Sequence, residues 1–104
     1  MAWLLLLVAA LFEIAWAVGL KYTHGFTKLG PSVLTIAAMV ISMLCLATAV
    51  RTIPIGTGYA IWTGIGAVGT ATLGIVLFAE PLTVWRALCL LMIVGGVIGL
   101  RFAS

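Results

Sequence analysis

The sequence predicts an all-α integral membrane protein, with four transmembrane helices in one domain over residues 1–104. Two features of its composition support this: 65% of the residues are hydrophobic and only 7% are charged, and the mean hydropathy is +1.40. A water-soluble chain of 104 residues could not bury that much apolar surface. The third observation is that the apolar runs are continuous. Membrane strands would alternate and would have to close a barrel, so the runs predict helices.

The first apolar run covers about residues 2–20, close to the roughly 20 residues that cross a bilayer. Its one charged side chain is Glu13, which lies more than two helical turns from either end. A carboxyl group at that depth costs several kcal/mol unless it faces protein or water. The run also lacks the basic start of a signal peptide. We therefore expect a retained helix whose Glu13 has a function.

The second and third spans are bounded by polar and turn-forming residues. A polar stretch covers residues 21–30, and Pro31 then suits the first position of a helix over about residues 31–50. Residues 51–57 contain Pro54 and Gly56 and predict a turn. The third span follows over about residues 58–78 and is rich in glycine, which permits close helix contacts.

The last connection and the fourth span complete the chain. Glu80 and Pro81 precede a span over about residues 84–100, and both residue types are favoured near a helix start. This span carries a small-residue surface for helix packing within a dimer, formed by Gly95, Gly96 and Gly99. The two cysteines lie inside apolar runs, so they read as packing residues and not as a disulfide.

The charges that flank the spans give no clear orientation in the membrane. Four spans place Arg51, Arg101 and the terminal amine on one side, and Lys21, Lys28 and Arg86 on the other. One interpretation is that so few charges carry no signal. The other is that the chain inserts in both orientations and pairs with an inverted copy of itself. Transporters are commonly built from two inverted repeats, and this chain holds one such unit. We therefore predict an antiparallel homodimer.

Several side chains can form a site around Glu13. Trp16 lies one turn from Glu13 on the same helical face, and Ser42, Tyr59 and Trp62 lie on the second and third spans. Each also has a structural interpretation, because buried aromatic residues often pack and membrane serines often bond their own backbone. We expect the neighbouring positions to line the pocket or pack near it: Ala10, Met39, Met43 and Gly66.

A carboxylate among aromatic rings in a low dielectric suits an organic cation. The carboxylate supplies charge and the rings supply cation–π attraction. A carboxyl group in such surroundings can exchange a proton for a cation near physiological pH. This chemistry predicts a proton-coupled cation antiporter. We expect no enzyme activity, metal or cofactor, and no nucleic-acid partner, since the net charge of +3 comes from residues that flank the spans.

The whole chain resembles the small multidrug resistance transporters, and within them the guanidinium exporter subtype. The segments that carry the resemblance are residues 12–17 (FEIAWA), 20–26 (LKYTHGF) and 54–67 (PIGTGYAIWTGIGA). The resemblance implies an antiparallel homodimer in the bacterial inner membrane, with both copies of one carboxylate at a midplane site where protons and substrate compete. The site residues it implies are Glu13, Trp16, Ser42, Tyr59 and Trp62. Two positions depart from the subtype, Ala10 where glycine is frequent and Met43 where an aromatic residue is common.

The predicted activity is proton-coupled export of guanidinium and small guanidinyl cations by the pair of Glu13 side chains. Guanidinium is planar and presents paired N–H donors that a carboxylate accepts side by side. We expect Ser42 to donate to the carboxylate and Trp16 to limit the thickness of the ion. Two alternatives stay open. One is a broad-specificity exporter of quaternary ammonium and other hydrophobic cations, and the other is a small channel or accessory membrane subunit.

Overall fold

The computed structural model describes residues 1–103, which form four helices and no strand. The helices are α1 (Ala2–Tyr22), α2 (Leu29–Ala49), α3 (Ile55–Phe78) and α4 (Val84–Ala103). Each is long and apolar enough to cross a membrane. The predicted all-α membrane fold with four spans is thereby confirmed.

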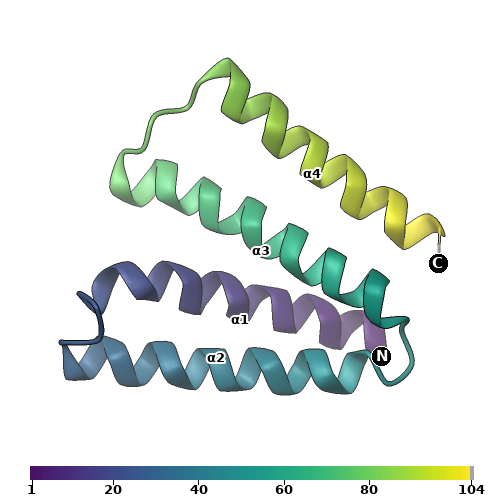
Figure 1. Cartoon of the computed structure of the whole chain (residues 1–104), viewed down its shortest axis with the longest axis horizontal. Helices are drawn as coiled ribbons and strands as arrows, with labels where there is room; N and C mark the ends of the chain where they lie inside the picture. Colours follow the sequence, from purple (N-terminus) through teal and green to yellow (C-terminus); the bar gives the residue numbers. More distant parts are fainter. Residues whose placement is uncertain (104) are drawn as a thin grey trace.

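The helices lie side by side in a slab (Figure 1). The slab measures 40 × 35 × 16 Å. α1 packs against α2 and α3, whereas α4 is outermost and packs mainly on α3, with one further contact from Arg101 to Trp3 on α1. Both termini and the α2–α3 connection lie at one end of the slab, and the other two connections lie at the opposite end. The flanking charges therefore divide between the two ends of the slab as the sequence predicts, with Arg51 and Arg101 at one end and Lys21, Lys28 and Arg86 at the other.

Five helix boundaries differ from the predicted ones by one to three residues. α1 ends at Tyr22 and not at residue 20, and α2 ends at Ala49 and not at residue 50. α2 begins at Leu29, so Pro31 is its third residue and not its first. Proline is still tolerated there, because the first N–H groups of a helix have no acceptor within the helix. α3 begins directly after Pro54, so residues 55–57 are helical and not part of a turn. α4 extends to Ala103, beyond the predicted end at residue 100.

Glu80 and Pro81 lie in the connection before α4, as predicted. Thr83 caps the start of α4, because its Oγ1 accepts a hydrogen bond of 3.2 Å from the Arg86 backbone N–H. Glu80 folds back toward α3, where its backbone N–H donates to the Gly74 carbonyl over 3.3 Å. The connection is therefore held by side chains and backbone on both of its flanks.

The glycines of α3 and α4 have different surroundings. A Cβ atom added to Gly66 would overlap the Glu13 side chain on α1, and one added to Gly64 would meet Val97 on α4. Added Cβ atoms on the small-residue surface of α4 would find no described atom within 4 Å at any of its three positions, Gly95, Gly96 and Gly99. None of the described residues of α4 is buried. Gly64 and Gly66 of α3 therefore serve contacts within the protomer, whereas the three glycines of α4 face outward.

Candidate functional site

Three helices meet at the hydroxyl group of Ser42. This side chain is completely buried on α2, and its Oγ donates a hydrogen bond of 2.6 Å to the Ala9 carbonyl on α1. The indole N–H of Trp62 on α3 lies 3.1 Å from Ser42 Oγ and 3.3 Å from the same Ala9 carbonyl. A serine and a tryptophan thus join α1, α2 and α3 through one backbone carbonyl.

Glu13 lies one turn further along α1, and Gly66 lies one turn further along α3. The Glu13 carboxyl group packs directly on Gly66, because glycine leaves the space that a Cβ atom would fill. Its Oε1 atom is buried and has no hydrogen-bond partner among residues 1–103. A buried polar atom without a partner is unfavourable and calls for a physical explanation. The protomer therefore leaves one oxygen of the Glu13 carboxyl group without a hydrogen-bond partner among its described residues.

Trp16, one turn beyond Glu13, also has a buried polar atom without a hydrogen-bond partner in the described chain. That atom is Nε1 of the indole ring, which is half-buried against the apolar core. An indole N–H can only donate, whereas an ionised carboxylate can only accept. Adjacent turns of α1 therefore present one unused donor and one unused acceptor.

The other predicted site residues surround these groups to different degrees. Tyr59 is 55% exposed and its ring centroid lies 5.7 Å from that of Trp62, with the planes tilted by 42°. Ala10 is completely buried, whereas Met43 is 45% exposed and Met39 is half-buried. Ser42 and Trp62 are joined directly, and Glu13 meets Gly66. Tyr59 joins the group through Trp62.

The hydrogen bond of Ser42 differs from the expected one. We expected the hydroxyl to donate to the Glu13 carboxylate, but in the protomer it donates to Ala9. The reason is the close packing of α1 on α2, which places the Ala9 carbonyl within reach, while Glu13 points to Gly66 on α3. This bond could not be predicted from the sequence, because the acceptor is the backbone carbonyl of Ala9 and does not depend on the alanine side chain.

Replacing Ser42 with alanine should destabilise the fold by about 1 kcal/mol, because the Trp62 N–H and the Ala9 carbonyl both lose a buried partner. The matched control is Thr48→Ala, since the Thr48 hydroxyl bonds the Leu44 carbonyl of its own helix over 2.8 Å at an exposed position. Reversible unfolding in detergent measures both variants. Equal free energies of unfolding for Ser42→Ala and Thr48→Ala would show that this bond contributes nothing to joining the helices.

Comparisons with known proteins agree on one family. The model of the family described as Small Multidrug Resistance protein matches residues 1–93. The guanidinium exporter of Proteus vulgaris is 61% identical over 104 residues, which cover 100% of both chains. The guanidinium exporters of Salmonella typhimurium strain LT2 and of Citrobacter freundii are 58% and 56% identical, over 100% of this chain and 99% of each relative.

The match covers all but the last part of α4, and the identities extend along the entire chain. Together with four helices of membrane-spanning length, they indicate a multi-pass protein of the bacterial inner membrane. The chain belongs to the small multidrug resistance family.

Proposed function

We propose that this chain exports guanidinium and small guanidinyl cations in exchange for protons. The single observation that carries the proposal is the buried Glu13 carboxyl oxygen without a partner, next to the unused indole N–H of Trp16. The relatives that match along the whole chain, at 56–61% identity, are guanidinium exporters.

A guanidinium ion satisfies the carboxylate in a way that its geometry favours. Its paired N–H groups donate side by side to the two oxygens of Glu13, and charge-assisted bonds of this kind are stronger than neutral ones. The Trp16 N–H supplies a further donor that can orient the carboxylate. Protonation of the same oxygen removes the negative charge and releases the cation. Protons and substrate therefore compete for one group, which is the requirement for exchange.

An antiparallel homodimer would complete the site. The Glu13 side chain is only partly buried in the protomer, and α4 exposes an unobstructed surface of small residues. Small residues let helices of neighbouring chains approach closely in membranes. A second copy in the opposite orientation would bring a second Glu13 to the midplane and supply the inverted repeat that alternating access uses.

Transport by protein reconstituted into vesicles tests the proposal. With a proton gradient, guanidinium uptake should exceed uptake of a tetraalkylammonium ion, and collapse of the gradient should abolish accumulation. A current carried by guanidinium without proton movement would instead indicate a channel. Preferential uptake of the tetraalkylammonium ion would indicate an exporter of broad specificity.

Labelling should show that the chain inserts in both orientations, because its flanking charges balance. In a variant without Cys45 and Cys89, an Ala103→Cys tag should react with membrane-impermeant maleimide from both sides of the membrane. Adding Thr52→Lys and Ile55→Lys, at exposed positions beside the α2–α3 connection, should restrict labelling to one side.

The biased variant alone should lose transport, and co-expression with a version biased the opposite way by Thr27→Lys and Leu29→Lys should restore it. Labelling of the unbiased chain from one side only would contradict the antiparallel arrangement.

Replacing Trp16 with glycine should reduce guanidinium transport about tenfold and improve transport of a tetraalkylammonium ion. The indole limits the thickness of the site and holds the carboxylate. Its loss should therefore admit a bulkier ion and weaken the binding of a planar one. Trp85→Gly is the control, because Trp85 is 78% exposed on α4, and it should leave the substrate ratio unchanged. Equal losses for both substrates in Trp16→Gly would assign Trp16 to packing alone.

A further inference from the structure

We propose that the cleft between α1 and α4 binds an anionic phospholipid, with its phosphate beside Lys21 and an acyl chain along α3. α3 lies between α1 and α4 (Figure 1), and these two flanking helices meet at one end of the cleft, where Arg101 stacks on Trp3. The cleft lies apart from Ser42 and its partners, which join the other face of α1 to α2.

Two cavities follow each other along this cleft. The first has a volume of about 390 Å³ and is lined by Lys21, Glu80 and Arg86 together with parts of α1 and α3. The second has a volume of about 250 Å³ and is lined entirely by apolar side chains and glycines, among them Ile14 and Val97. A charged cavity at the end of the spans, followed by an apolar one at membrane depth, matches the order of headgroup and acyl chain in a phospholipid.

The charges in the first cavity favour an anion. Arg86 Nη2 forms an ion pair of 3.1 Å with Glu80 Oε1, and Nη1 donates to the Pro81 carbonyl over 2.7 Å. Glu80 therefore neutralises Arg86. Lys21 has no carboxylate partner in the described chain, and its Nζ lies 5.6 Å from the centroid of the Phe78 ring. One positive charge is left over at the level where lipid phosphates lie.

A hydroxyl group in the same cavity also lacks a partner. Thr70 lines the cavity, and its buried Oγ1 forms no hydrogen bond within residues 1–103. Thr72, two residues further along α3, bonds the Val68 carbonyl of its own helix over 2.8 Å, the usual arrangement for a membrane threonine. A phosphate or glycerol oxygen in the cavity would give Thr70 the acceptor that its own helix does not provide.

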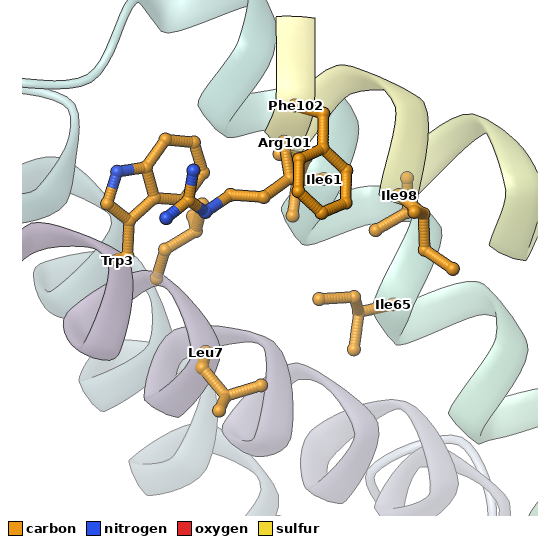
Figure 2. A pocket seen from close by; sticks show the side chains of 9 residues that line it. Trp3, Leu7, Ile61, Ile65, Ile98, Arg101 and Phe102 are labelled. Atoms are coloured by element: carbon orange, nitrogen blue, oxygen red, sulfur yellow. The ribbon is translucent and has the colours of Figure 1, made fainter. Parts of the chain in front are cut away.

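The opposite end of the cleft is closed by the chain itself. Figure 2 shows Arg101 reaching from α4 to the ring of Trp3 on α1, with a distance of 4.3 Å from guanidinium to ring centroid. The cavity beneath it, about 260 Å³, is otherwise lined by apolar residues. Arg101 lies closer to its aromatic partner than Lys21 lies to Phe78, and its cavity has no hydroxyl group among the described residues that line it, so the phosphate is expected at the Lys21 end.

Lipid retention measured by native mass spectrometry tests this site. The full-length protein is exchanged into mixed micelles that contain phosphatidylglycerol and phosphatidylethanolamine in equal amounts. The expected result is preferential retention of phosphatidylglycerol, weakened about fivefold by Lys21→Gln. The matched control is Lys28→Gln, which removes the same charge from the same end of the slab, outside the cavity, and should leave retention unchanged. Ala71→Trp, which fills the charged cavity, should abolish retention in a chain that still folds.

Three outcomes would overturn the proposal. Equal retention by Lys21→Gln and Lys28→Gln would show only general attraction of anionic lipid to a basic protein. Full competition by inorganic phosphate would identify a site for soluble phosphate. Protection of an Ala71→Cys thiol from maleimide in lipid-free detergent would show that a second copy of the chain covers the cleft.

Discussion

Replacing Glu13 with glutamine is expected to abolish proton-coupled exchange completely while leaving a folded protein. Glutamine keeps the size of the side chain and its contact with Gly66, so packing should survive. It cannot lose a proton, and therefore offers neither a charge to the cation nor a group through which protons compete with substrate. Guanidinium uptake driven by a pH gradient in reconstituted vesicles measures the loss, and gel filtration in detergent measures the fold.

The matched control is Glu80→Gln, which removes the other carboxylate of the chain. Glu80 is exposed in the α3–α4 connection, so this variant should retain exchange that depends on the proton gradient. Proton-driven uptake by Glu13→Gln at the rate of the parent protein would remove Glu13 from the mechanism. Loss of coupling in Glu80→Gln alone would move the proton site to the connection.

Replacing Gly66 with alanine should lower transport at least tenfold with little loss of stability. The added methyl group would overlap the carboxyl end of Glu13, which is flexible and can move aside, whereas backbone could not. The fold should therefore survive, but the carboxylate would leave its position. Transport at several substrate concentrations and unfolding in detergent separate the two effects.

Gly56→Ala is the control for this variant, because it lies on the same helix and an added methyl group meets no described atom within 4 Å. Alanine also favours a helix over glycine by about 1 kcal/mol, so this control should transport normally and unfold no more easily. Equal transport by both variants would show that the contact between Gly66 and Glu13 has no role in function.

Much of the fold could be predicted from the sequence because membrane helices depend on length and hydropathy alone. Four continuous apolar runs require four helices, whatever packs against them. The ends were less predictable, since helix starts depend on hydrogen bonds at single residues. Pro31 is compatible with either the first or the third position of α2. Which position it takes depends on whether the two residues before it are helical. The end of α3 depends in the same way on the hydrogen bond from the Glu80 backbone N–H to the Gly74 carbonyl.

The candidate site was predictable where a side chain is out of place in a membrane. Glu13 could be identified because it is a charged residue in an apolar run, and Trp16 because it lies deep within the membrane span. The acceptor for Ser42 was not predictable, because it is a backbone carbonyl and depends on how closely α1 and α2 approach. Gly66 was expected near the site, but its direct support of the carboxyl group depends on the register between α1 and α3, which no single helix reveals.

The partial burial of Glu13 in the protomer has a consequence for gene dosage. If two protomers must meet before the carboxylate is enclosed, the working unit forms by a second-order encounter in the plane of the membrane. At low expression, export would then rise with the square of the number of chains, so halving transcription would cut it about fourfold. At high expression the dependence becomes linear. A modest change in the activity of one promoter would thus change the export rate more than proportionally.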